Sequence, residues 1–169
     1  MTASDLLAKA AMLEGKYVQS FPEFGPERMG APIRAFTRIS DSPINLHCTI
    51  YEPHMVVVLD STLLKTVPVT QGLPKGGILV VNTKEINREF MERTRLAGYK
   101  LWTVPATEIA VRISGTGITN TAMLGAIVRA SAVINLKSLE QTLSGRFSAK
   151  IAEKNLEIMK EAYREAKLA

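Results

Sequence analysis

Two runs of consecutive apolar residues constrain the fold of this chain more than any other feature of its sequence. The segments MVVVLD at 55–60 and GILVVNT at 77–83 are rich in valine and show no regular polar alternation. Runs of this length and composition are typical of strands that are covered on both faces of a parallel sheet. A weaker run, LWTVPA at 101–106, predicts a third strand.

Segments with helical patterning separate these strands and follow them. A short one lies near 61–66, and another lies at 84–96, where Ile86 and Phe90 are four residues apart. Strands that alternate with helices predict a mostly parallel sheet with right-handed crossovers. Three further helices are predicted after the last strand, at 120–134, which is apolar almost all round, at 138–147 and at 149–168.

The N-terminal part has a different pattern. Apolar residues at helical spacing predict a helix at 3–13, which Gly15 would end. Residues 16–21 and 32–39 are predicted strands joined by an irregular loop. The predicted fold class is therefore α/β: a single domain, residues 1–169, with a mostly parallel sheet flanked by helices and a strand–loop–strand region near the N-terminus.

Composition limits the classes of function. No apolar run reaches the roughly 18 residues of a membrane-spanning helix, and no basic and apolar leader opens the sequence. We therefore expect a cytoplasmic protein with no membrane partner. The formal charge is +5, but basic and acidic residues are interspersed along the chain, so we expect no nucleic-acid partner either.

The sequence offers few groups for catalysis. The single cysteine, Cys48, excludes an internal disulfide or a CxxC site, and its apolar surroundings predict a buried, inert thiol. His47 and His54 are too few for a histidine-rich metal site, and we assign them no role. Nothing resembles a nucleophile elbow, a Ser/His/Asp set or a paired general acid and base. We therefore predict no catalytic residue and no metal site in this chain.

The first of two stretches with functional potential is QSFPEFGPERMGAP at 19–32. Its prolines and glycines predict a loop with one defined shape. Long ordered loops are often functional, but this one can also be a simple connection in which Glu27 and Arg28 cap neighbouring backbone. The residue types leave both interpretations open.

The second stretch is SGTGITNTAMLG at 114–125, where a Gly-x-Gly is followed by Thr119, Asn120 and Thr121 at a predicted helix start. Helix N-termini attract phosphates and other anions through free N–H groups. The alternative is an ordinary N-cap made by Thr119 or Asn120. The spacing fits neither a P-loop nor the dinucleotide-binding fingerprint.

Five segments, in the same order along the chain, resemble segments of one known protein family. They are YVQSFPEFGPERMGAPIRAFTRIS (17–40), YEPHMVVVLDSTLL (51–64), GLPKGGILVVNT (72–83), NTAMLGAIVRA (120–130) and AEKNLEIMKEAY (152–163). Together they resemble the gamma subunit, or gamma domain, of 2-oxoacid:ferredoxin oxidoreductases, particularly the pyruvate enzymes. The resemblance covers essentially the whole chain.

This resemblance implies a heteromeric enzyme with alpha, beta and delta-type partner subunits. In such enzymes other subunits hold thiamine diphosphate, Mg²⁺ and [4Fe–4S] clusters, electrons leave to ferredoxin, and coenzyme A takes up the acyl group. This chain would bind none of these cofactors tightly alone, and would scaffold the complex and help to enclose coenzyme A. The implied contacts to coenzyme A or a neighbouring subunit are Gly25, Glu27, Arg28, Gly30, Asn120 and Thr121, with Arg28 pairing with a phosphate or a partner chain.

The sequence departs from the family in one respect. Family members begin with a strand and a G-x-G-G-Q-G turn ahead of the helix that corresponds to 3–13, whereas this sequence starts with Met1-Thr2-Ala3-Ser4. We therefore expect Met1 to be an internal residue of a longer protein. Two other functions are considered: a gamma-type subunit of a branched-chain 2-oxoacid, 2-oxoglutarate or indolepyruvate enzyme, and a stand-alone domain that binds a nucleotide or small molecule at its strand ends.

Overall fold

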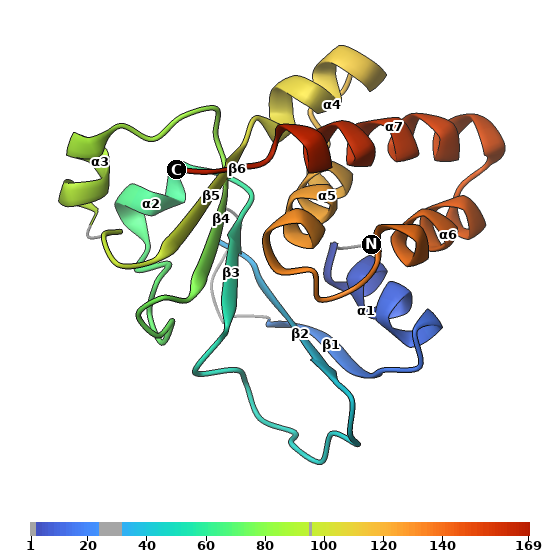
Figure 1. Ribbon diagram of the computed structural model, residues 1–169, viewed down its shortest axis with the longest axis horizontal. Helices are drawn as coiled ribbons and strands as arrows, with labels where there is room; N and C mark the ends of the chain where they lie inside the picture. Colours follow the sequence, from blue (N-terminus) through green and yellow to red (C-terminus); the bar gives the residue numbers. More distant parts are fainter. Residues whose placement is uncertain (1–2, 24–31, 95) are drawn as a thin grey trace.

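The computed structural model of the chain describes residues 3–23, 32–94 and 96–169. Within these ranges the strands form two sheets, and helices cover the larger one on both faces (Figure 1). This is the predicted α/β class, with a mostly parallel sheet and an antiparallel strand pair near the N-terminus.

The larger sheet has the strand order β3-β4-β5-β6. The first three strands are parallel to one another, and the short last strand runs antiparallel along β5. The smaller sheet is an antiparallel pair, β1 and β2. Their bounds are β1 Tyr17–Glu23, β2 Arg34–Ser40, β3 Met55–Val58, β4 Ile78–Asn82, β5 Lys100–Val104 and β6 Lys167–Leu168.

Alternate residues of β4 point into two different apolar clusters. Val80 packs with residues of the helices α5 (Asn120–Ser131) and α7 (Ala149–Glu165), whereas Leu79 and Val81 pack with Leu64 and Leu96. The valine-rich run at 77–83 therefore forms a strand covered on both faces, as predicted. In β3 only Val58 is buried, because this strand pairs with β4 alone among the described residues and lies at an edge of the sheet.

Helix α5 is the most deeply buried helix of the fold, as its apolar sequence predicts. Every residue from 121 to 128 is buried. Gly125 is the reason that α5 can approach α7 so closely: a Cβ at this position would overlap the backbone carbonyl of Met159.

The N-terminal helix α1 (Ala3–Leu13) has the predicted bounds and covers one face of the β1–β2 pair. Gly15 ends it with φ +75°, and the N–H of Lys16 donates to the carbonyl of Ala11 at 3.1 Å. Val18 and Ile39, one from each strand, join the apolar cluster that α1 shares with α5.

The remaining helices show where local patterning was misleading. The helix predicted at 84–96 is shorter, α3 (Arg88–Arg93), because the Asn87 side chain caps it by accepting the Phe90 N–H at 2.8 Å. The helix predicted at 149–168 ends at Glu165, and the next residues become β6, with the N–H of Ala169 donating to Leu101. Helix α4 (Ala106–Ser114) was not predicted, while α2 (Leu63–Thr66) and α6 (Leu136–Arg146) were.

The prediction of a buried Cys48 is wrong. Its side chain is exposed, because the segment 41–54 between β2 and β3 runs over the surface. Backbone carbonyls hold this segment in place: those of Cys48 and Thr49 accept from Arg38, at 2.7 and 3.3 Å, and that of Leu46 accepts from Gln19 at 2.8 Å.

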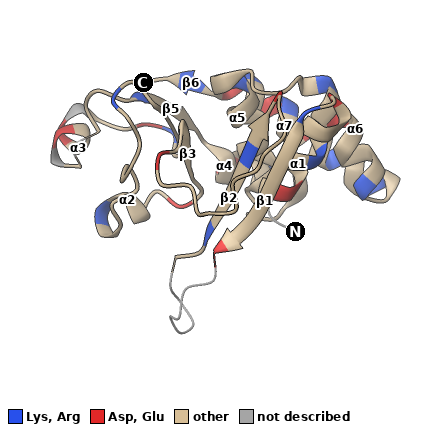
Figure 2. Ribbon diagram, turned by 90° about the horizontal axis from the view of Figure 1, so that it is seen from below, with Lys and Arg blue, Asp and Glu red and all other residues tan. Residues whose placement is uncertain are grey.

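Charged residues are interspersed over the described elements, with lysines and arginines next to acidic residues on most helices (Figure 2). None of the helices in the described ranges combines the length and the apolar character needed to cross a membrane.

Candidate functional site

Polar residues follow each of the three parallel strands at the edge where these strands end. Asp60 lies two residues beyond β3, Asn82 is the last residue of β4, and Thr107 lies three residues beyond β5. In open α/β sheets, ligands bind outside the carboxyl ends of the strands. We therefore take this carboxyl edge as the candidate site.

Asn82 fastens the three strand ends together. Its Nδ2 donates to the carbonyl of Leu59 and to Oγ1 of Thr107, both at 2.8 Å. Its Oδ1 accepts the backbone N–H of Thr107 at 3.2 Å. Both amide hydrogens and the amide oxygen are thus engaged, so one side chain fixes the turn after β3 relative to the first turn of α4.

Asp60 presents a fixed negative charge at the β3 end of this edge. Its Oδ1 accepts hydrogen bonds from the hydroxyl of Thr62 at 2.7 Å and from the backbone N–H of Thr62 at 2.9 Å. The hydroxyl first, and then the N–H, lower the pKa of Asp60 below 3.8 because both stabilise the ionised form. The side chain is exposed, and Oδ2 has no hydrogen-bond partner within the described ranges.

The second predicted stretch comes to the same edge. Helix α4 ends at Gly115 with φ +77°, and the Ser114 hydroxyl donates to the carbonyl of Ala110 at 2.8 Å. The chain then passes Thr107. A Cβ added at Gly117 would lie 3.9 Å from the methyl group of Thr107. The connection from α4 to α5 therefore runs close to the α4 residue that Asn82 holds.

Asn120 and Thr121 start α5 and have different surroundings. Asn120 is partly exposed, and Thr119 precedes it at the N-cap position without a side-chain capping bond. Thr121 is only 4% exposed, and its hydroxyl donates to Oδ1 of Asn155 on α7 at 2.7 Å. Because the first N–H groups of a helix lack intrahelical partners, the start of α5 offers hydrogen-bond donors.

The other predicted contacts, Gly25, Glu27, Arg28 and Gly30, lie outside the described residues. The structure describes the two strands on either side of this segment, β1 and β2, whose ends are joined by an ion pair between Glu23 and Arg34.

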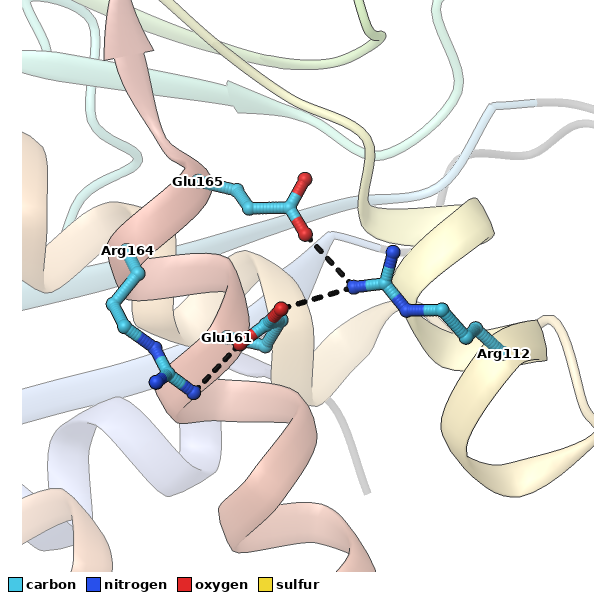
Figure 3. Close-up of polar contacts among 4 residues, drawn as sticks. All are labelled: Arg112, Glu161, Arg164 and Glu165. Atoms are coloured by element: carbon cyan, nitrogen blue, oxygen red, sulfur yellow. Dashed lines mark hydrogen bonds and ion pairs between the residues drawn. The ribbon is translucent and has the colours of Figure 1, made fainter.

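A charged cluster joins α4 to α7 beside the site (Figure 3). Nη2 of Arg112 lies 2.8 Å from Glu165 and 3.1 Å from Glu161, and Arg164 also pairs with Glu161. The hydrogen bond to Glu165 and the charges of nearby carboxylates raise the pKa of Arg112 above its ordinary value. Lys84, Glu108 and Lys167 complete a shallow mixed-charge cavity of about 270 Å³ with Arg112, Glu165 and Pro105.

Sequence reasoning missed Asp60, Asn82 and Thr107. A signal was present, since Asp60 and Asn82 are polar residues directly after valine-rich runs, at the ends of predicted parallel strands. The contacts of Asn82 with Leu59 and Thr107, by contrast, join residues 23 and 25 positions apart and depend on how the strands align.

Comparison with known proteins identifies the family of this chain. Residues 1–165 match the model of the family described as pyruvate ferredoxin/flavodoxin oxidoreductase. The chain is 48% identical over 163 residues to the pyruvate/ketoisovalerate oxidoreductases common subunit gamma of Thermococcus litoralis, covering 96% of this chain and 88% of that protein.

Two solved structures are similar. The pyruvate oxidoreductase subunit PORC of Thermotoga maritima superimposes with a TM-score of 0.86 and 40% identity, over 98% of this chain and 88% of that one. A 2-oxoglutarate:ferredoxin oxidoreductase from Magnetococcus marinus, solved with coenzyme A bound, has the same fold with a TM-score of 0.73 and 17% identity, over 99% of this chain and 29% of that one. This chain belongs to the pyruvate ferredoxin/flavodoxin oxidoreductase family, as a gamma-type subunit of a heteromeric oxidoreductase.

Proposed function

We propose that this subunit serves a pyruvate-type 2-oxoacid:ferredoxin oxidoreductase and helps to enclose coenzyme A while the acyl group is transferred to it. The observation that carries the proposal is that Asn82 joins the ends of β3 and β4 to the first turn of α4, and that the connection from α4 to α5 passes close to Thr107 in this turn. The edge supplies hydrogen-bond donors and acceptors but none of the nucleophile or acid–base sets that a self-sufficient active site needs.

The groups proposed to meet coenzyme A have separate tasks. The side chain of Asn120 and the N–H groups at the start of α5 donate to phosphate oxygens, which the helix dipole also favours. Thr121 holds this helix start in place through its hydrogen bond to Asn155. Gly25, Glu27, Arg28 and Gly30 are proposed to close the site or to meet a neighbouring subunit, with Arg28 as the cationic partner of a phosphate or a carboxylate.

The oxidative chemistry is assigned to partner chains. A [4Fe–4S] cluster requires four thiolates, and this sequence contains one cysteine, so the donor set does not fit a cluster. Nor do the described ranges hold a group of three metal-ligating side chains that would suit Mg²⁺. We therefore assign thiamine diphosphate, Mg²⁺ and the clusters to alpha, beta and delta-type subunits, which pass electrons to ferredoxin. We also propose a single domain over 1–169 and a cytoplasmic location for the complex.

A second 2-oxo acid is a specific alternative to pyruvate alone. The gamma subunit of Thermococcus litoralis is named as common to pyruvate and ketoisovalerate oxidoreductases. We propose that this chain can likewise assemble with more than one set of partners, because the carboxyl edge described above contacts coenzyme A rather than the 2-oxo acid. Activity of the complexes co-purified with this chain, measured on pyruvate and on ketoisovalerate, tests this alternative.

The coenzyme A assignment is tested with Asn120→Ala in the assembled oxidoreductase. We expect the KM for coenzyme A to rise about tenfold, since a hydrogen bond to a charged group is lost, while the KM for pyruvate stays constant. Asn135→Ala is the matched control: Asn135 occupies the N-cap of α6, also without a side-chain capping bond, and lies outside the site. An unchanged KM for coenzyme A in Asn120→Ala would contradict the assignment.

A further inference from the structure

The shallow cavity of about 270 Å³ beside the charged cluster lies between α4, the end of α7 and β6. Three cationic side chains line it, those of Lys84, Arg112 and Lys167, together with two carboxylates, those of Glu108 and Glu165. The cavity therefore carries an excess of one positive charge.

The carboxylates of this cavity are already committed to Arg112. Its Nη2 lies 2.8 Å from Glu165 and 3.1 Å from Glu161, which also pairs with Arg164 (Figure 3). The hydrogen bond to Glu165 raises the pKa of Arg112, and the negative charge of Glu108 adds to this effect. The acidic groups thus neutralise the guanidinium and leave the lysines as the source of the excess charge.

Lys84 and Lys167 are exposed, and neither has an ion-pair partner within the described ranges. Backbone pairing fixes where both residues lie. Lys167 is the cross-strand neighbour of Thr103 in β5, and Thr83, next to Lys84, forms a bridge with Val104. Two lysines from distant parts of the sequence are therefore brought to one cavity by the sheet, without a counterion.

We propose that this cavity is a docking site for an aspartate or glutamate side chain of a partner subunit, whose carboxylate binds between Lys84 and Lys167. The inference rests on membership in a heteromeric oxidoreductase family and not on the coenzyme A assignment. One carboxylate carries one negative charge, which matches the excess of the cavity. Complementary charges of this kind select a partner and orient it as it binds.

A phosphate group is the rival anion. A phosphate monoester carries about two negative charges at neutral pH, which is more than the cavity can neutralise. It would also lie against the carboxylates of Glu108 and Glu165, whose repulsion acts at short range in a partly enclosed site. The mixture of charges in the lining therefore favours a carboxylate.

The surroundings of the cavity favour a protein over a free acid. Val111 and Leu168 are the sequence neighbours of Arg112 and Lys167, and they are 50% and 59% exposed. A protein surface that inserts a carboxylate can cover these apolar side chains at the same time, which adds hydrophobic stabilisation. A small free acid would lose its translational freedom in a shallow cavity without this gain.

Chemical cross-linking of the assembled oxidoreductase tests the contact directly. A carbodiimide joins a lysine amine to a carboxylate that lies in contact with it, and mass spectrometry identifies the two peptides. We expect Lys84 or Lys167 to be joined to an aspartate or glutamate of a partner chain. Links from these lysines only to Glu108 or Glu165 of the same chain would overturn the proposal.

Charge reversal tests the energetic contribution. The variant is Lys84→Glu with Lys167→Glu, and the matched control is Lys137→Glu with Lys150→Glu, at two exposed lysines of α6 and α7 that have no ion-pair partner among the described residues. Both variants change the net charge equally. We expect the variant to raise the dissociation constant for the partner subunits about tenfold, with a smaller effect at high salt, and the control to leave it unchanged.

The circular dichroism of the free variant shows whether it folds, and Lys84→Ala with Lys167→Ala replaces it if it does not, with a smaller loss of affinity in the same direction. Equal affinities for the variant and the unaltered chain would overturn the proposal, and so would an equal loss in the control. Normal assembly with a raised KM for coenzyme A would assign the cavity to a phosphate instead. None of these results bears on the Asn120→Ala test, so the two proposals fail separately.

Discussion

Asn82 and Asp60 illustrate how single side chains define the carboxyl edge. Asn82 uses both amide hydrogens and its oxygen within the protein, so its task is to hold neighbouring backbone. Oδ1 of Asp60 accepts two hydrogen bonds from Thr62 in its own turn, and Oδ2 has no partner among the described residues. Among the described residues, the side chain of Asn82 thus has partners for all of its polar atoms, whereas the side chain of Asp60 has one oxygen without a partner.

The hydroxyl of Thr62 should control the ionisation of Asp60. We expect Thr62→Val to raise the pKa of Asp60 toward 3.8, because the largest stabilising contact of the carboxylate is removed while the Thr62 N–H remains. A folded-state pKa below the unfolded value contributes stability that is present at higher pH and is lost as the pH falls through the folded pKa. The variant should thus lose part of this contribution, which acts above pH 3.8.

Titration of the Asp60 carboxyl carbon by NMR measures this change directly. Ser61→Ala is the control, because it removes a neighbouring hydroxyl that does not bond to Asp60 in the structure. A pKa that is the same in Thr62→Val and in the unaltered chain would show that the hydroxyl is not its cause.

Helices α5 and α7 form the central packing contact among the elements. Small residues of α5 allow a close approach, and the backbone of Met159 lies directly against Gly125. The packing of α5 on α7 also places Thr121 against Asn155, and so it sets where α5 begins. The ion pairs from Arg112 to α7 are partly exposed, and we assign them less of the stability, since exposed pairs contribute about 0–1 kcal/mol.

Two glycine-to-alanine substitutions should act in opposite directions. Gly125→Ala should lower the free energy of unfolding by about 1–3 kcal/mol or more, because the added methyl overlaps the Met159 carbonyl. Gly145→Ala should raise it by up to about 1 kcal/mol, because Gly145 lies in α6 with open space at its Cβ position and alanine is the better helix former. Urea denaturation of the two variants measures both changes, and a neutral Gly125→Ala would contradict the close packing.

At the scale of the whole molecule, the chain provides a scaffold whose carboxyl edge we propose as a binding site. Three apolar clusters form its core, and two of them share Met55 and Val57 of β3. Within the described ranges, no three His, Cys, Asp or Glu side chains form a group that could hold a metal ion. A gamma-type subunit of a heteromeric oxidoreductase fits this description, and we propose that partner chains supply the rest of the chemistry.

The isolated chain should not oxidise any 2-oxo acid. One cysteine cannot hold a four-thiolate cluster, so electrons from a decarboxylation would have no acceptor within this chain. We expect pyruvate-dependent reduction of a viologen dye to be undetectable with the chain alone and to appear when partner subunits are added. Steady turnover by the purified chain without partners would contradict this division of labour.

Much of the fold could be predicted from local patterns. The valine-rich runs predicted β3 and β4, and the apolar periodicity predicted α1 and α5. Gly15 predicted the end of α1. The errors lie where a distant contact overrides the local pattern. The last predicted helix gives way to β6 because the edge of β5 offers backbone partners to residues 167–169.

The sequence by itself determined the α/β class, because this depends on local periodicity. It also determined the family and the lack of the four cysteines that a [4Fe–4S] cluster needs, because these depend on residue identity. The tertiary structure alone decided which polar residues form the carboxyl edge. Asn82 meets Leu59 and Thr107 only after three strands align in parallel, and Thr121 faces Asn155 only because Gly125 lets two helices touch. Contacts between residues far apart in the chain follow from packing, which a linear pattern does not contain.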